Sequence, residues 1–431
     1  MQYNFYPHNK PNARMQANHF IFLTLLSAVV GLPGCSPAEK ALLTLQVSNP
    51  LNDDRMNEVV EMDASLLKGI RSGSFCLKDE AQKECPYQFT SDGKFLFSAS
   101  VAANGSSLYR LVPGRPAPAD TLLHGRQFKE RDDDFAWEND RSAYRAYGPA
   151  LQARGERGFG YDIFTKRVER PVLEKFYANA CNQQVWNVIN ELRRNGHQAQ
   201  GDSLERTISY HVDHGEGMDV FSVGPTLGAG TAALLDAEGN IAFPWCYERH
   251  EVLDQGPLRF TFRLTFRPFA LGSDQEVVES RTISLDRGAF LNRTVEHFGG
   301  LTAPTPLAAG IPLRPQHPDG FATDAQHGWV AYADSTDNAH AGNGVIYVAA
   351  LSPAFTRTLV QHYKPEERRD HGNALGHVLA VGDYAPQSDF TYYWGSGWSK
   401  GFMPDMRAWK NYLTHFSQCL RHPLEVKVRK K

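Results

Sequence analysis

The densest run of polar side chains in the sequence occupies residues 210–219. It contains His211, Asp213, His214 and Glu216 among glycines, which let a backbone turn sharply and approach a ligand closely. A strand that ends at His211 would deliver these side chains to the turn, with Asp213 placed to orient an imidazole. The residue types suit a metal shell or an acid–base pair, so His211, His214 and Glu216 are catalytic candidates. Polar turn residues that only satisfy one another are the alternative.

A second cluster lies at residues 245–250. Alternation along a strand would place Tyr247 and Arg249 on one face, and Glu248 and His250 on the other. An arginine beside a phenol lowers the pKa of the phenol, which makes Tyr247 a candidate proton donor. Arg249 is then a candidate partner for an anionic substrate group. A salt-bridged strand without a catalytic role is the alternative.

Two further groups suit a hydroxylated, charged ligand. Glu138, Asn139 and Arg145 follow an aspartate-rich run and could clamp such a ligand, whereas ordinary surface charge is the alternative. Trp394 and Trp398 flank a Gly-Ser-Gly turn. Aromatic faces of this kind stack on the apolar face of a sugar ring, and burial in the core is the alternative for both tryptophans.

Some common catalytic motifs are missing. The sequence contains no P-loop and no HExxH, and no GxGxxG follows a clear strand. P-loop nucleotide hydrolysis, HExxH zinc proteolysis and dinucleotide-dependent dehydrogenation therefore have no support. Cys181, Cys246 and Cys419 lack the CxxC or CxxH spacing of a zinc site. The cofactor stays unknown from the sequence, and a divalent cation is one candidate.

Composition limits the class of protein. The chain has 431 residues, with 45 basic and 48 acidic side chains, a net charge of −3, and 42% hydrophobic residues. This profile excludes a disordered tail, a coiled coil and a collagen-like fibre. A near-neutral chain lacks the basic field that binds a phosphate backbone, so no nucleic-acid partner is expected. The 36 glycines, 25 prolines and 11% aromatic residues favour β-rich structure.

Residues 1–34 have the organisation of an export signal. Lys10 and Arg14 precede an apolar run at 20–30, which is shorter than the about 20 residues that span a bilayer. The sequence Leu-Pro-Gly-Cys that ends at Cys35 is similar to a bacterial lipobox, although proline replaces its usual small residue. We expect an exported protein of the periplasm or outer membrane, lipid-anchored at Cys35 and touching the membrane only through that lipid. Ordinary secretion is the alternative.

The remaining chain reads as two β-rich parts. Short alternating segments separated by turn residues fill residues 41–112 and predict a small β-sandwich. Residues 113–125 begin with several prolines and are interpreted as a linker. From 126 to 420 the strands are longer, and residues 259–267 alternate strictly between apolar and polar side chains. Apolar stripes with helical spacing predict helices at 185–192 and 406–416.

Three long segments resemble a known family. They are FAWENDRSAYRAYGPAL at 135–151, HGEGMDVFSVGPTLGAG at 214–230 and YWGSGWS at 393–399, and they look like domain-of-unknown-function family 4861. That family consists of exported bacterial proteins, often encoded with polysaccharide-degrading enzymes. The resemblance implies an all-β chain, in which a small N-terminal β-domain precedes a galactose-mutarotase-like β-supersandwich, the expected catalytic domain, at 126–420. It also associates the chain with uronate-containing oligosaccharides, without specifying a reaction.

The leading hypothesis for function is β-elimination at a uronate, by a lyase that cleaves a glycosidic bond or a dehydratase that expels water from the non-reducing end. Such a reaction needs a cation at the substrate carboxylate and a base beside the neighbouring carbon. Arg145, Arg249 or a bound cation would supply the first, and His211, His214 or Tyr247 the second. The substrate would be an acidic oligosaccharide.

Other functions stay open. A mutarotase-like or glycoside hydrolase reaction would use His214 and Glu216 as acid and base. A non-catalytic glycan-binding lipoprotein would rely on Trp394 and Trp398. For the enzymatic hypotheses we expect the residues proposed at 211–216 to meet Tyr247 and Arg249 on one concave face of the larger domain.

Overall fold

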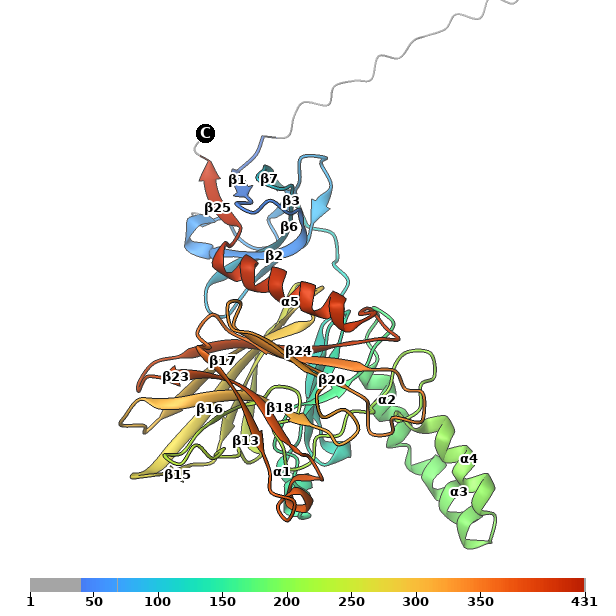
Figure 1. Ribbon diagram of the computed structural model, residues 1–431. Helices are drawn as coiled ribbons and strands as arrows, with labels where there is room; N and C mark the ends of the chain where they lie inside the picture. Colours follow the sequence, from blue (N-terminus) through green and yellow to red (C-terminus); the bar gives the residue numbers. More distant parts are fainter. Residues whose placement is uncertain (1–39, 68, 430–431) are drawn as a thin grey trace, which may run out of the picture. The chain divides into compact units, whose positions relative to one another are not determined.

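The computed structural model describes residues 40–67 and 69–429 (Figure 1). The expected signal segment 1–34 and the lipidation site Cys35 lie outside the described residues. Within the described residues, no helix is both long enough and apolar enough to cross a bilayer. Antiparallel sheets make up most of the regular structure, which confirms the all-β class expected from the sequence.

The smaller core lies between short sheets built mainly from the N-terminal part of the chain. One sheet has the order β25-β1-β7-β3-β4 and another the order β2-β6-β5. The strands are β1 (Leu43–Ser48), β2 (Arg55–Asp63), β3 (Phe75–Lys78), β4 (Glu84–Cys85), β5 (Tyr87–Phe89), β6 (Lys94–Val101), β7 (Ser106–Pro113) and β25 (Glu425–Arg429). Strand β25 pairs with β1, so segments from opposite ends of the chain complete one sheet.

The larger core lies among longer sheets. Their strand orders are β11-β10-β9-β8, β12-β18-β23-β22 and β13-β14-β16-β17-β24-β21-β20-β19, with β15 paired to β16. The strands are β8 (His124–Phe128), β9 (Asp134–Glu138), β10 (Ala143–Ala146), β11 (Asp162–Phe164), β12 (Ala232–Leu234), β13 (Tyr247–Gln255), β14 (Arg259–Phe266), β15 (Phe269–Leu271), β16 (Asp274–Asp286), β17 (Leu291–Gly299), β18 (Thr305–Leu313), β19 (Phe321–Asp324), β20 (Trp329–Asp334), β21 (Ile346–Leu351), β22 (Arg357–His362), β23 (Gly376–Tyr384) and β24 (Phe390–Trp398).

Strand β14 illustrates how the sequence pattern becomes a core. Its apolar side chains Phe260, Phe262 and Leu264 are fully buried, whereas Arg263 between them is exposed, as the alternation predicted. The two cores are in contact, because the amide of Gln88 in β5 bonds the backbone of Leu258 and Arg259. Residues Lys40–Lys431 accordingly form one compact unit. The division at 41–112, 113–125 and 126–420 stays a prediction.

The helices are few and short relative to the sheets. They are α1 (Pro149–Ala153), α2 (Leu173–Ala180), α3 (Gln183–Arg194), α4 (Gln198–Ile208) and α5 (Met406–Arg421). The helices expected at 185–192 and 406–416 correspond to α3 and α5 and are confirmed. Asp405 caps α5, whose Trp409 and Leu413 pack against the strands around β20 and β21.

The segment before His211 differs from its expected form. It is the helix α4 rather than a strand, and α4 packs against α3 as a helical hairpin that projects from the sheets (Figure 1). Arg193 of α3 joins the two helices through ion pairs with Asp202 and Glu205 of α4. The sequence predicted a strand that ends at His211, but these contacts with the neighbouring helix stabilise a helix there.

Glu138 and Lys166 form an ion pair whose side chains are both fully buried, with their charged atoms 2.7 Å apart. Lys166 also donates to the backbone carbonyl of Asn139. The Glu138 carboxylate in turn accepts from the backbone amides of Val172 and Leu173 at 2.9 Å, where α2 begins without a side-chain cap of its own. Glu138 therefore caps α2 from β9 and helps to fix α2 to the sheet.

The variant Lys166→Met should lower the free energy of unfolding by about 3–5 kcal/mol, because it leaves the Glu138 carboxylate buried without its cation. Urea denaturation followed by circular dichroism measures the loss. Lys427→Met is the control, since Lys427 pairs with Glu425 at the surface and should contribute less than about 1 kcal/mol. Equal losses for the two variants would contradict the structural role given to the buried pair.

Candidate functional site

The turn at 209–219 holds its two histidines against its own backbone. His211 Nδ1 lies 2.8 Å from the carbonyl oxygen of Asp219, and His214 Nε2 lies 3.1 Å from that of Ser209. Asp213 accepts from the backbone amides of Gly215 and Gly217 rather than orienting an imidazole. The contacts around both rings therefore stabilise the turn itself, which was the alternative considered from the sequence.

Glu216 is buried in this turn and carries two cationic partners. Its carboxylate oxygens lie 2.5 Å from Arg170 and 2.6 Å from Lys175. Burial works against ionisation of Glu216, yet Lys175 and Arg170 lower its pKa. A carboxylate held in this way stays charged and fixed, which makes it a poor acid for sugar chemistry and a good anchor for the turn.

Tyr247 and Arg249 do not share a face. A β-bulge interrupts the pairing of β13 with β14 between them, so the expected alternation is lost. Tyr247 is buried next to the ring of His250, and its hydroxyl donates to the carbonyl of Asp133, whereas Arg249 is exposed. Burial raises the pKa of Tyr247, the reverse of the lowering expected from a neighbouring arginine.

The residues expected to clamp a ligand or stack on a sugar are buried. Glu138 has the structural role described above, and the Asn139 amide donates to two backbone carbonyls of the neighbouring loop. Trp394 is 0% exposed and stacks on Tyr161 at 3.9 Å. Trp398 is also buried and donates to the carbonyl of Asn343. A surface for sugar stacking must therefore come from other aromatic residues.

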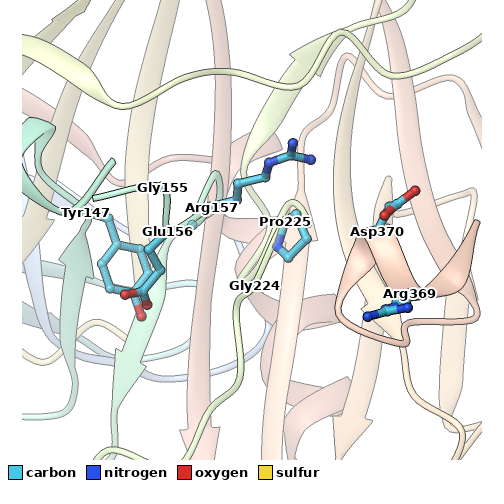
Figure 2. A pocket seen from close by; sticks show the side chains of 9 residues that line it. Tyr147, Gly155, Glu156, Arg157, Gly224, Pro225, Arg369 and Asp370 are labelled. Atoms are coloured by element: carbon cyan, nitrogen blue, oxygen red, sulfur yellow. The ribbon is translucent and has the colours of Figure 1, made fainter. Parts of the chain in front are cut away.

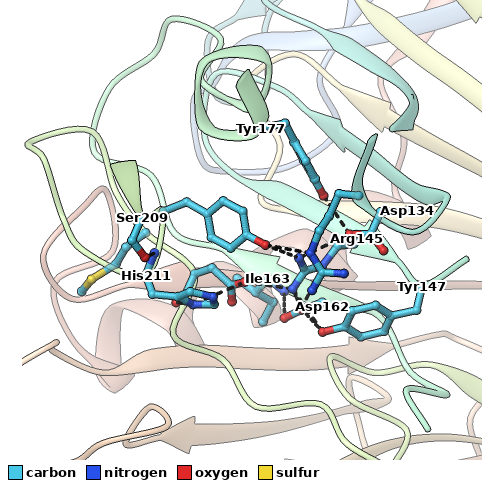
Figure 3. A network of polar contacts seen from close by, with 12 residues as sticks. Asp134, Arg145, Tyr147, Asp162, Ile163, Tyr177, Ser209 and His211 are labelled. Carbon is cyan, nitrogen blue, oxygen red and sulfur yellow. Dashed lines mark hydrogen bonds and ion pairs between the residues drawn. The ribbon is translucent and has the colours of Figure 1, made fainter. Parts of the chain in front are cut away.

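Arg145 lies at the centre of a buried polar network (Figure 3). Its guanidinium contacts Asp134 at 3.4 Å, Asp219 at 2.8 Å and Asp162, which is directly opposite Arg145 in the pairing of β10 with β11. The hydroxyl of Tyr147 donates to Asp162 and accepts from Arg145 Nη2 at 3.1 Å. Arg145 therefore binds internal carboxylates rather than a ligand, and it connects them to Tyr147.

This network contains more negative than positive charge. Burial and the charge of Asp162 raise the pKa of Asp219 to about 7, although Arg145 opposes the shift. Burial likewise raises the pKa of Asp134 to about 6 and the pKa of Tyr147 well above its usual range. At neutral pH Tyr147 therefore carries its proton.

A pocket of about 460 Å³ opens beside Tyr147 (Figure 2). Its volume is within the range of small-molecule sites. The lining residues come from three distant parts of the chain and are Tyr147, Gly155, Glu156, Arg157, Gly158, Gly224, Pro225, Arg369 and Asp370. None of His211, His214, Glu216, Tyr247 and Arg249 lines this pocket.

The sequence explains how the pocket forms. Strand β10 ends before Tyr147, and α1 begins with proline directly after Gly148, which sends the chain into the loop 154–158. A side chain at Gly158 would begin 2.4 Å from the ring of Tyr147, so only glycine lets this loop lie against the ring. Tyr147 thus lines the pocket, and its hydroxyl also contacts the buried network.

The pocket offers complementary charges to a ligand. Arg157 and Arg369 are exposed guanidiniums that suit a carboxylate, and Glu156 and Asp370 are exposed carboxylates that suit hydroxyl groups. Figure 2 shows Tyr147 and Glu156 together at one end of the pocket, with Arg369 and Asp370 at the other. Tyr147 lies in the segment 135–151 that carries the family resemblance, but the sequence did not single it out, because Asp162 and the pocket residues around Gly224 and Arg369 come from other parts of the chain.

In the part of the chain that the structure describes, no group of three or more histidine, cysteine or acidic side chains could hold a metal ion. Asp134, Asp162 and Asp219 converge, but the guanidinium of Arg145 lies among them. The divalent cation considered from the sequence stays a prediction without a ligand set among these residues.

The model of the family described as domain of unknown function DUF4861 matches residues 47–426. The uncharacterized protein P7 of Formosa agariphila is 24% identical over 432 residues, which cover 95% of this chain and 100% of that protein. Two solved Enterococcus faecalis structures, an alpha-mannosidase and a protein of glycosyl hydrolase family 38, align with 90% of this chain at 8% identity, with TM-scores of 0.45 and 0.46. This chain spans 46% and 47% of their lengths.

The raised pKa of Asp219 predicts a pH-dependent stability. Folded Asp219 keeps a proton that the unfolded chain releases near pH 3.8, so its stabilising contribution is complete below that pH and is lost as the pH rises to about 7. Asp219→Asn stays neutral throughout. The free energy of unfolding of the unmodified protein should therefore fall relative to that of Asp219→Asn between pH 4 and pH 7, by at most about 1.4 kcal/mol per pH unit, and melting temperatures measured over this range should show the fall.

Asp383→Asn is the control, because Asp383 is an exposed aspartate on β23. Its difference from the unmodified protein should stay nearly constant over the same range. A constant difference for Asp219→Asn as well would show that Asp219 is ionised in the folded protein, which contradicts the predicted proton uptake.

Proposed function

The chain belongs to the DUF4861 family, and we propose that it is a carbohydrate-active enzyme that acts on a uronate-containing oligosaccharide at the Tyr147 pocket. The observation that supports this most is the position of Tyr147, which borders an open polar pocket and is hydrogen-bonded to the buried Arg145 network. The proposal includes export and lipid attachment at Cys35. It agrees with the association with acidic polysaccharides implied by the family resemblance.

The charges of the pocket support a uronate as substrate. A sugar acid has one carboxylate and several hydroxyls, so it needs a cationic partner and several hydrogen-bond acceptors. Arg157 and Arg369 would bind the carboxylate, and Glu156 and Asp370 would accept hydroxyl protons. An arginine at the carboxylate also stabilises the negative charge that develops there when a proton leaves the neighbouring carbon.

The proposed reaction is β-elimination with Tyr147 as the proton carrier. The phenol oxygen takes the proton from the carbon next to the substrate carboxylate, while its own proton passes along the existing hydrogen bond to Asp162. The electrons of the broken C–H bond form a C=C bond, and the adjacent C–O bond breaks. The departing oxygen receives the proton back through Tyr147. Arg145 supports the negative charge on the phenol oxygen during the transfer.

The outcome depends on the leaving group. If the departing oxygen belongs to another sugar the enzyme is a lyase, and if it is a hydroxyl the enzyme is a dehydratase. Both products contain the same unsaturated uronate. The catalytic role considered for His211 and His214 passes to Tyr147 in this proposal, because Tyr147 borders the pocket and the histidines contact the turn backbone.

Glycoside hydrolysis is a second candidate, which the two pocket carboxylates favour. Glu156 and Asp370 border the pocket from different segments, and hydrolases commonly use a pair of acidic residues around the scissile bond. Hydrolysis releases reducing ends without forming a double bond. Its activity should disappear in Glu156→Gln and Asp370→Asn.

The test of elimination uses Tyr147→Phe, which keeps the ring and removes the hydroxyl. Oligomers of galacturonate, glucuronate and mannuronate are incubated with each protein, and the absorbance of the conjugated double bond is followed. The unmodified protein should produce this absorbance with at least one oligomer. Tyr147→Phe should be slower by on the order of 10²–10⁴-fold, the usual contribution of a positioned proton carrier.

Tyr210→Phe is the matched control. Tyr210 also contributes its hydroxyl to the Arg145 network, at 3.5 Å from Nη1, but it does not line the pocket. It should retain most of the rate. Elimination is excluded if the panel gives no absorbance, and the role of Tyr147 is excluded if both variants lose the same activity.

A further inference from the structure

A cluster of aromatic rings lies next to the pocket. We define it as the aromatic wall, formed by the exposed Trp245 and the half-buried Phe159 and Phe243. Trp245 is 45% exposed although it is the largest type of apolar side chain. The ring centroids of Phe159 lie 5.9 Å from Trp245 and 5.6 Å from Phe243, so the three rings form one continuous surface.

The backbone fixes the direction of Trp245. Its neighbours Pro244 and Cys246 are both buried, and strand β13 begins at the buried Tyr247. Burial on either side anchors the segment and directs the indole outward. Phe159 then packs against the indole, which limits the rotamers that Trp245 can adopt. A rigid, solvent-accessible ring of this kind loses little conformational entropy when a ligand stacks on it.

The aromatic wall is continuous with the pocket on two sides. Phe159 directly follows Gly158, which lines the pocket. Phe243 contacts the ring of His371 at 5.4 Å, and His371 directly follows the pocket residue Asp370. His371 also lies 3.1 Å from the carbonyl of Pro225, another lining residue. A chain-like ligand bound in the pocket would therefore extend onto the aromatic wall.

We propose that the aromatic wall is a stacking subsite for a second sugar unit of the oligosaccharide whose uronate occupies the pocket. The apolar C–H face of a pyranose matches an aromatic ring, and neighbouring sugar hydroxyls remain in water. Three rings are too small an area for a stable protein interface, which buries about 800 Å² per partner. The inference rests on the proposed function for the identity of the ligand, but binding at the subsite does not require catalysis.

The subsite predicts a dependence on chain length. Binding is measured by calorimetry with the monomer and the tetramer of galacturonate, glucuronate and mannuronate, in the Tyr147→Phe background, in which consumption of the substrate should be slow. Trp245→Ala should weaken binding of the preferred tetramer about tenfold, which corresponds to about 1.4 kcal/mol. Binding of the monomer should not change. Trp245→Phe retains an aromatic ring and should recover most of the loss.

Trp186→Ala is the matched control, because Trp186 is a partly exposed tryptophan on α3 that belongs to neither the pocket nor the aromatic wall. It should bind the tetramer normally, and melting temperatures verify that each variant is folded. Unchanged tetramer binding by Trp245→Ala overturns the subsite. Equal weakening of monomer and tetramer also overturns it, because Trp245 would then support the pocket itself.

The same experiment separates the subsite from the proposed reaction. If tetramer binding depends on Trp245 but the unmodified protein never produces a double bond, the subsite stands and the elimination fails. If the double bond forms at the same rate and with the same KM in Trp245→Ala, the elimination stands and the subsite fails. If no oligomer of the panel binds, both are overturned.

Discussion

The candidate site depends on a single buried guanidinium. Arg145 contacts carboxylates from β9, from β11 and from the end of the 209–219 turn, so it joins parts of the chain that are far apart in sequence. Arg145 and the nearby Arg131 cannot neutralise all three carboxylates, and protons must make up the difference. The proton on Tyr147 is therefore linked to the charge balance of the whole network. Any ligand that changes this charge balance at the pocket also changes the protonation of the buried network.

Sequence reasoning succeeded where the relevant information is local. Alternation along β14 and the apolar stripes of α3 and α5 depend on neighbouring residues, and the family resemblance depends on contiguous segments. It did not reveal the surroundings of Arg145, because the burial of a polar side chain depends on partners that sequence spacing does not show. Asp219 is distant from Arg145 in the chain, yet their side chains are 2.8 Å apart.

Sequence spacing also did not reveal whether the tryptophans are buried or exposed. Trp394 and Trp398 stand in a glycine-rich segment that suggested an exposed turn, but the segment is the buried strand β24 and its glycines allow close packing. Trp245 precedes β13 and gave no separate signal, since a lone tryptophan between a proline and a cysteine fits a core equally well. Only the burial of its two neighbours reveals that the indole points outward.

The pairing of β25 with β1 has a consequence for how the protein is made. During synthesis β1 leaves the ribosome early, and its outer edge cannot be covered until residues 425–429 have been produced. The intervening chain contains the whole larger core, which can pack first. Throughout that time β1 presents an open backbone edge that invites pairing with other chains. Strand β25 therefore protects the open edge of β1 from aggregation only after the larger core has been synthesised.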